Sequence, residues 1–248
     1  MKKHSIWVGF FAFMTLSTFV QAQEKESHHY LSLEDVASSL ELLPPPPAVN
    51  SILFLNDEAQ YRWGKMQRPT PRGDQAVSDA RLYGDGVAKS FSEAFGMTIS
   101  KEGTPEIYKL ISHFREDAGD YATRSAKEHY MRMRPFTFYN EDTCNTEQQQ
   151  GLSTNGSYPS GHTAIGWATA LVLAEINVER QNEILKRGYE IGQSRVICGY
   201  HFQSDVDAGR LVASAVVARL HANKEFMNQL NKAKAEFAKL SAQSGNGR

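Results

Sequence analysis

The chain has 248 residues and a formal net charge of −1, so it has no basic excess of the kind that binds a nucleic acid polymer. Its two cysteines, Cys144 and Cys198, do not make a zinc site. A substrate anion would therefore have to be attracted by a local cluster of cations.

Residues 1–22 are predicted to be a secretory signal peptide. Lys2 and Lys3 precede an apolar run from Ile6 to Val20, and Ala22 supplies the small residue of a cleavage site. The run is shorter than the roughly 20 residues of a membrane-spanning helix. We therefore expect cleavage, export and no membrane segment in the mature chain.

The two cysteines of an exported protein pair more often than they stay free. A disulfide between Cys144 and Cys198 would stabilise the fold by about 2–4 kcal/mol. Two buried free thiols are the alternative, because the sequence does not give the distance between them.

The N-terminal part of the mature chain is predicted to be loose at its start and extended at its run of prolines. Residues 23–41 read as a flexible segment, and the four prolines Pro44 to Pro47 exclude a helix. The proline run is either a stiff connector on the domain surface or a recognition segment for another protein.

From Ser51 onward the apolar spacing is helical, and period-two alternation is scarce. Thr104-Pro105-Glu106 marks a helix start, and Pro135 disfavours helical geometry at Arg134. The sequence predicts a single all-α domain over residues 42–241, a helical bundle with a buried central pair of helices and a disordered tail at 242–248. The predicted helices are Asn56–Met66, Asp74–Phe95 as one helix or two, Pro105 to about Met133, His162–Ile176, Glu179 to about Gly192 or beyond, Ser204–Ala222 and Glu225–Leu240, with a polar loop at 136–158.

The first chemical motif is Lys127-x6-Arg134-Pro135. Seven residues are nearly two helical turns, so we expect both cations to leave the same face of one helix and to clamp a phosphate. A solvated basic face that includes Arg124 and Arg132 is the alternative for this pair alone.

The second motif is Pro159-Ser160-Gly161-His162. Glycine permits close approach of the backbone to a ligand, and the free N–H groups of a helix that begins here would face an anion. His162 could protonate a departing oxygen at that helix end. An ordinary turn with Ser160 as the N-cap is the alternative.

The third motif is Ser194-Arg195-x5-His201-x3-Asp205. A carboxylate that holds one nitrogen of a histidine fixes the tautomer and leaves the other nitrogen free to react. Arg195 adds a guanidinium suited to a phosphate. A core histidine with a local hydrogen bond is the alternative.

Together the three motifs resemble the signatures K-x6-R-P, P-S-G-H and S-R-x5-H-x3-D of the acid phosphatase and vanadium haloperoxidase superfamily, with a match at every motif position. The segments Leu43–Pro47, Gly156–His162 and Ser194–Gly199 are similar to the bacterial class A non-specific acid phosphatases. Tyr200 and Phe202 differ from the alanine and tryptophan that flank the nucleophile in many relatives, which leaves the leaving-group preference open.

The resemblance implies a periplasmic, metal-independent acid phosphatase that hydrolyses phosphate monoesters through a phosphohistidine. It implies His201 as the nucleophile, Asp205 as its orienting partner and His162 as acid and base, with the histidine pKa values pushed apart to give an optimum at about pH 5–7. Phosphate would be held by Lys127, Arg134, Ser160, Gly161, His162 and Arg195. No metal or cofactor is expected, the substrates would be small phosphate esters including nucleotides, and relatives form homo-oligomers.

Three other functions remain open. An apyrase-type nucleotide diphosphohydrolase would share every catalytic residue, and a vanadate-dependent haloperoxidase would use the same cage. A non-enzymatic binding module would use the proline run. Membrane lipid phosphatases of the superfamily are disfavoured because no later segment has a long enough apolar run.

Overall fold

The computed structural model describes residues 29–245, which form helices and connecting segments without a strand. The all-α prediction is confirmed. The α-helices are α1 (Ser39–Leu42), α2 (Ile52–Gln67), α3 (Pro71–Ser78), α4 (Gly86–Phe95), α5 (Pro105–His113), α6 (Ala122–Tyr130), α7 (Pro135–Phe138), α8 (Gln149–Ser153), α9 (Gly161–Ile176), α10 (Gln181–Ile197), α11 (Gln203–Leu220) and α12 (Lys224–Gly245).

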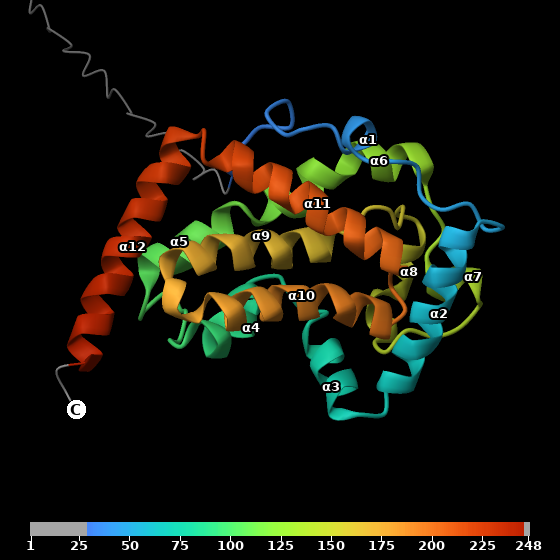
Figure 1. The fold of residues 1–248 in the computed structure, drawn as a ribbon, viewed down its shortest axis with the longest axis horizontal. Coiled ribbons are helices and arrows are strands. Elements are labelled where there is room, and N and C mark those ends of the chain that lie inside the picture. The colour runs from blue at the N-terminus through green and yellow to red at the C-terminus, as the bar shows by residue number, and fades with distance from the viewer. Residues whose placement is uncertain (1–28, 246–248) are drawn as a thin grey trace, which may run out of the picture.

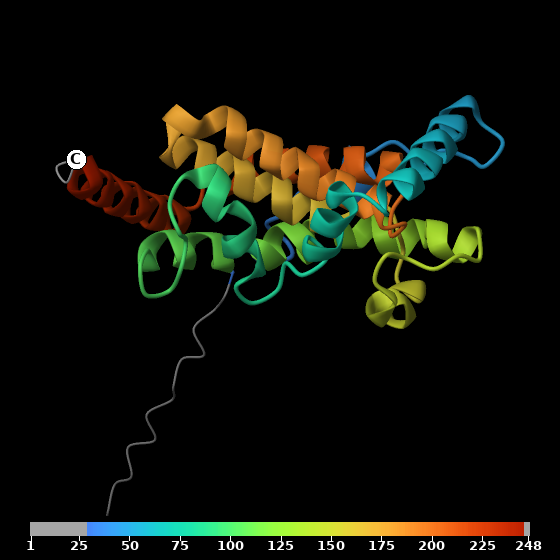
Figure 2. The same ribbon diagram turned by 90° about the horizontal axis from the view of Figure 1, so that it is seen from below.

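The long helices α9, α10 and α11 lie side by side in the middle of the molecule (Figure 1). A second layer contains α5 and α6, and α2 stands at the end of the molecule opposite α12 (Figures 1 and 2). The predicted buried central pair is therefore enlarged to three helices, with α9 packed against both α10 and α11.

Helix α9 is the core of the bundle because it is apolar all round. Ala164, Ile165 and Ala170 lie on three different faces of the helix and are all buried. A side chain at Gly188 of α10 would place its Cβ only 2.4 Å from the Cβ of Ala170. The absence of that side chain lets α9 and α10 approach closely enough to align the ends that carry motif residues.

The helix predicted from Pro105 to about Met133 is interrupted. It begins at Pro105 as expected, but α5 ends at His113, a π-helical turn covers Asp117–Tyr121, and α6 ends at Tyr130. Met131 takes a left-handed conformation with φ of 40°, and Arg134 is extended before Pro135. Lys127 and Arg134 therefore do not share one helix face.

The region 136–158 is not a plain loop. It contains α7, a 3₁₀ turn at Thr146–Gln148 and α8. Elements this short have little stability of their own, so periodicity does not reveal them. A disulfide between Cys144 and Cys198 ties the region to the end of α10, which confirms the predicted pairing.

Residues 29–47 lie against the bundle. The Asp117 carboxylate accepts hydrogen bonds from the Tyr30 and Leu31 N–H groups, and the Tyr158 hydroxyl donates to the Pro44 carbonyl at 2.8 Å. At the other end, α12 continues to Gly245, into the predicted tail. The predicted signal peptide lies outside the described residues, and within residues 29–245 no helix is both long and apolar enough to cross a membrane.

Candidate active site

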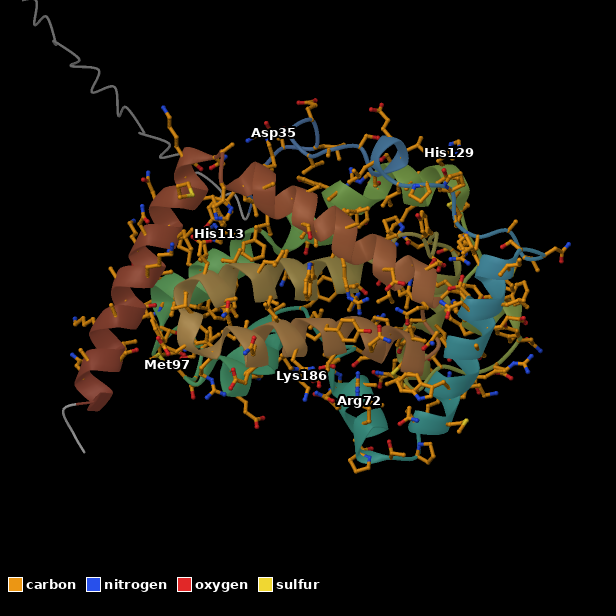
Figure 3. The ribbon with its side chains drawn as sticks, viewed as in Figure 1. Asp35, Arg72, Met97, His113, His129 and Lys186 are labelled. Atoms are coloured by element: carbon orange, nitrogen blue, oxygen red, sulfur yellow. A yellow bond between two sulfur atoms is a disulfide. The ribbon has the colours of Figure 1, made fainter. Side chains whose placement is uncertain are left out.

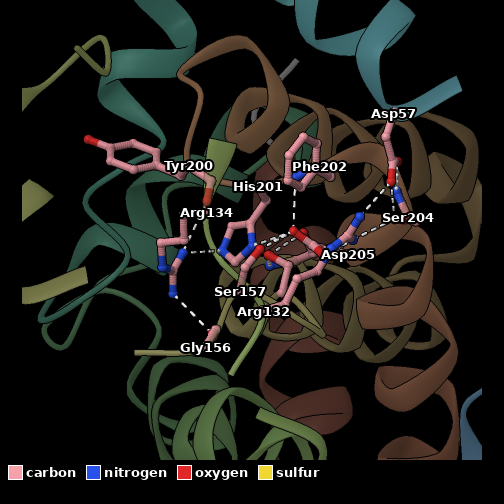
Figure 4. A network of polar contacts seen from close by, with 12 residues as sticks. Asp57, Arg132, Arg134, Gly156, Ser157, Tyr200, His201, Phe202, Ser204 and Asp205 are labelled. Atoms are coloured by element: carbon pink, nitrogen blue, oxygen red, sulfur yellow. Dashed lines mark hydrogen bonds and ion pairs between the residues drawn. The ribbon is translucent and has the colours of Figure 1, made fainter. Parts of the chain in front are cut away.

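The motif residues meet at one end of the bundle. Lys127 comes from α6, Arg134 precedes α7, and Ser160 to His162 begin α9. Arg195 lies in the last turn of α10, and the connection to α11 carries His201. Three segments separated by tens of residues thus face one another, and Figure 4 shows the part of this site around His201 and Asp205.

Asp205 is the fully buried centre of this network. Its Oδ2 atom accepts a hydrogen bond from the Phe202 N–H at 2.9 Å and another from the Ser157 hydroxyl. Its Oδ1 atom accepts from Arg132 at 2.5 Å. Burial opposes ionisation, but Arg132, His201 and Ser157 hold the pKa of Asp205 well below its usual range.

His201 is 2% exposed, and its two ring nitrogens face different groups. Nε2 lies 3.0 Å from a guanidinium nitrogen of Arg134, and Nδ1 lies 3.4 Å from Oδ2 of Asp205. A guanidinium can only donate, so Nε2 must accept and the proton of the neutral ring belongs on Nδ1. Burial and Arg134 lower the pKa of His201 well below its usual value, which keeps the lone pair on Nε2.

Arg134 is held rigidly and is 3% exposed. Its Nε donates to the carbonyls of Leu152 and Asn155 at 2.9 and 3.1 Å, and Nη1 also donates to the Tyr200 carbonyl at 3.1 Å. Burial lowers its pKa to about 10. The region around α8 therefore positions the guanidinium that contacts the His201 ring.

Arg195 is 1% exposed and stacks over the Tyr200 ring, 4.0 Å from its centroid. Within residues 29–245, no hydrogen-bond partner reaches its Nε, Nη1 or Nη2 atoms. Burial lowers its pKa to about 9. A buried guanidinium whose donors are unused is costly, and a bound oxyanion would satisfy it.

Lys127 supplies the third cation. Its Nζ donates to the Gly156 carbonyl at 2.9 Å. Burial and the nearby Arg134 lower its pKa to about 7. Near neutral pH this lysine is therefore only partly charged.

The start of α9 is built by Ser160 and Gly161. The Ser160 hydroxyl accepts from the Thr163 N–H at 3.3 Å, so it acts as the N-cap that the alternative reading of this motif expected. A Cβ at Gly161 would lie 2.4 Å from the Gly119 carbonyl. The glycine is thus required for packing against the π-helical turn, a constraint that the sequence did not reveal.

His162 lies in the first turn of α9. Its Nε2 is 3.3 Å from the Ala80 carbonyl, and its ring meets the Tyr83 ring edge-on with centroids 6.0 Å apart. Burial and then Arg195 lower the pKa of His162 well below its usual value. Both site histidines are therefore neutral in the free protein.

Comparisons with known proteins agree with this arrangement. The PAP2 superfamily matches residues 118–227, which contain all three motifs. The chain is 61% identical over 235 residues to the non-specific acid phosphatase of Providencia stuartii, covering 92% of this chain and 95% of that one. It is also 41% identical over 233 residues to the non-specific acid phosphatase of Salmonella typhimurium, covering 94% of this chain and 92% of that one.

The chain belongs to the bacterial class A acid phosphatases of the PAP2 superfamily. It is accordingly a phosphoric monoester hydrolase, and phosphate esters are its substrates. A more distant relative, the acid phosphatase of Zymomonas mobilis, is 34% identical over 224 residues and covers 90% of this chain and 84% of its own.

The acid phosphatase site also contains two charged residues that the motifs did not identify. Arg132 bonds Asp205 and reaches Asp57 of α2 at 2.8 Å. In the sequence, Arg132 entered only the alternative reading of a solvated basic face. That reading is wrong for Arg132, because α6 ends at Tyr130 and the side chain is paired with two buried carboxylates. Pro135 limits the helix only to about Met133, so it gave no signal that α6 ends at Tyr130.

A groove of about 1130 Å³ lies away from the motif residues of the acid phosphatase. It lies between α3, α4 and α10, and none of the motif residues lines it. Its wall carries both signs of charge, including Asp79, Lys186 and Glu190, and Figure 3 shows Lys186 and Arg72 on this side of the molecule. The mixture of charges gives it no preference for anions.

If an oxyanion binds at Arg195, this residue should increase the affinity for phosphate without stabilising the phosphate-free enzyme. Inorganic phosphate should raise the melting temperature of the native enzyme as RT ln(1 + [L]/Kd). Arg195→Met should lose most of that rise but should melt no earlier without phosphate, because it removes an unpaired buried charge. Calorimetry with and without phosphate checks this, and an equal phosphate-induced rise in the variant would contradict it.

Proposed function

We propose that this acid phosphatase works through a covalent phosphohistidine on His201. Nε2 would attack phosphorus, forming the N–P bond as the ester P–O bond breaks in line. His162 would give its proton to the departing oxygen. Asp205 would stabilise the imidazolium that forms, since its Oδ2 lies 3.4 Å from Nδ1.

The second step would regenerate the enzyme. His162, now neutral, would take a proton from a water molecule, whose oxygen attacks the phosphorus. The N–P bond then breaks, its electron pair returns to Nε2, and inorganic phosphate leaves. The same two histidines therefore serve both steps.

The observation that carries this proposal is the surroundings of His201 Nε2. It is the unprotonated nitrogen of a buried ring, and Arg134 lies 3.0 Å from it. The partly buried Lys127 and the buried Arg195 add two more cations nearby, and Arg195 has unused donors among the described residues. A nucleophile surrounded by cations with spare donors suits a phosphoryl group.

Phosphate binding is proposed to rest on Lys127, Arg134 and Arg195 together with the N–H groups of the first turn of α9, from Ser160 to His162. These groups are held by the fold before substrate arrives, so they need no reorganisation during the reaction. Each donor aimed at charge that develops in the transition state is worth about 3–4 kcal/mol. These side chains supply the positive charge that a metal ion provides in other phosphatases, so no metal or cofactor is included.

His201→Ala is predicted to abolish phosphate release from p-nitrophenyl phosphate and AMP, measured with EDTA present. Quenching the native enzyme in alkali during turnover should trap phosphate on His201, because the N–P bond survives base, and peptide mass spectrometry locates it. His129→Ala, an exposed histidine of α6, is the control and should keep full activity. ATP in the same assay measures any apyrase-type preference. Substantial activity in His201→Ala would show that His201 is not the nucleophile.

His162→Ala is predicted to discriminate between leaving groups. Hydrolysis of an alkyl phosphate should fall about 10²–10⁴-fold, since a poor leaving oxygen needs a proton. With p-nitrophenyl phosphate the first step should persist as a burst of nitrophenol, because only water activation is lost. Stopped-flow absorbance measures the burst. Equal losses on both substrates without a burst would exclude His162 as the general acid.

We further propose that the enzyme is periplasmic and self-associating. Export is supported by the apolar Ile6–Val20 run and by the Cys144–Cys198 disulfide. Self-association is supported by exposed apolar side chains of α2, where Ile52 is 85% and Met66 69% exposed. The periplasmic fraction should contain a chain that begins at Gln23 by mass spectrometry, and its sedimentation should exceed that of a monomer.

A further inference from the structure

Behind the His201–Asp205 pair lie two further charged residues, Arg132 and Asp57, that are not part of any motif. Two nitrogens of the Arg132 guanidinium are divided between two carboxylates, with Nη1 at 2.5 Å from Oδ1 of Asp205 and Nη2 at 2.8 Å from Oδ2 of Asp57. Figure 4 shows the resulting row of Asp57, Arg132, Asp205 and His201. Arg132 thus connects α2, at the edge of the fold, to the site.

The row is closed on its remaining sides. The Ser204 N–H and hydroxyl both donate to Asp57, at 2.8 and 2.6 Å, and Arg132 Nη1 also reaches that hydroxyl at 2.7 Å. The Phe202 ring covers the guanidinium, 4.5 Å from its carbon. The two carboxylates are fully buried and the Arg132 side chain is 9% exposed. Partnered charges at this depth are costly to build, so their geometry is closely fixed.

Arg132 contacts Asp205 on the oxygen opposite to the one that faces His201. It therefore cannot touch a substrate held at Nε2, and it can act on the reaction only through Asp205. Two effects follow from its position. It fixes the orientation of the carboxylate, and it neutralises part of the charge that would otherwise favour a protonated His201.

We propose that Arg132, clamped by Asp57, is a positioning residue that aligns Asp205 and divides its negative charge so that His201 remains an unprotonated nucleophile. The inference rests on the proposed phosphohistidine mechanism. Asp57 would act in the opposite sense, since it draws Arg132 away from Asp205.

The protonation of His201 depends on charges from every neighbouring element. The positive groups come from three places: helix α6, helix α10 and the segment that precedes α7. A second histidine comes from α9, and the negative charge comes from α11. These groups are Lys127, Arg134, Arg195, His162 and Asp205. Arg132 and Asp57 differ from them because they lie behind Asp205, so substituting them leaves the cations of the phosphate cradle in place.

The test compares Arg132→Met and Asp57→Asn with native enzyme. The control is Arg219→Met. Arg219 lies near the C-terminal end of α11, far from the site, and the substitution breaks its exposed ion pair with Asp35. The acid limb of the kcat/KM profile reports the neutral fraction of the nucleophile in the free enzyme. NMR titration of the histidine rings, with His201 identified by its loss in His201→Ala, reports its pKa directly.

Arg132→Met should move the acid limb and the His201 titration upward by about one pH unit or more. Asp57→Asn should move both downward or leave them in place, and Arg219→Met should change neither. The inhibition constant of inorganic phosphate should stay within about threefold of native at a pH above the limb, while kcat of Arg132→Met falls. Arg132→Lys should return the titration of His201 toward its native position.

Other results would overturn the inference. If the limb of Arg132→Met stays in place, or if phosphate affinity falls as much as kcat, Arg132 only supports the local structure. If Arg132→Met does not fold, an upward shift of the His201 titration in Asp57→Asn, or an upward shift of about one pH unit in Arg132→Lys, would count against the proposal. Failure of the mechanism itself is distinguishable, because His201→Ala would then keep its activity whatever Arg132→Met does.

Discussion

Four cations lie around the His201–Asp205 pair in this protein, and within residues 29–245 only one of them is matched by ion pairs with carboxylates. Arg132 is neutralised by Asp205 and Asp57, whereas Lys127, Arg134 and Arg195 have no carboxylate of their own among the described residues. Their pKa values are lowered to about 7, 10 and 9 by burial. Desolvated like charges repel, so the fold must hold them in place against that repulsion.

The three central helices provide that support. The close contact of α9 and α10 at Gly188 fixes the end of α10 that carries Arg195. The disulfide from Cys198 fixes the region whose carbonyls hold Arg134. Carbonyl oxygens can offset part of a cation's desolvation without adding a negative charge. In the proposed mechanism the uncompensated positive charge would be left for a dianionic substrate, so that stability would be given up for substrate affinity.

The sequence predicted the helical class and placed each motif beside a helix boundary, because capping residues, prolines and apolar periodicity are local signals. It could not predict the path of the chain at Met131, where a left-handed residue ends α6 and separates Lys127 from Arg134. Asp57 was not recognisable for a different reason. Its partners Arg132 and Ser204 are distant in sequence, and a single aspartate on an amphipathic helix looks solvated until tertiary contacts bury it.

Burial also offers a reason why, in the proposed mechanism, activity would be highest at acidic pH. In the proposed mechanism Lys127 would bind phosphate as a cation, and its pKa of about 7 means that the charge is lost as the pH rises above neutrality. As the proposed general acid, His162 would have to carry a proton in the complex, yet burial and Arg195 lower its pKa in the free protein. A bound phosphate dianion reverses part of that effect by adding negative charge beside the ring. As the proposed nucleophile, His201 would have to be neutral, and its lowered pKa would extend the working range toward acid. Desolvation would therefore move both the acid limit of activity, set by His201, and the alkaline limit, set by Lys127 and His162, to lower pH.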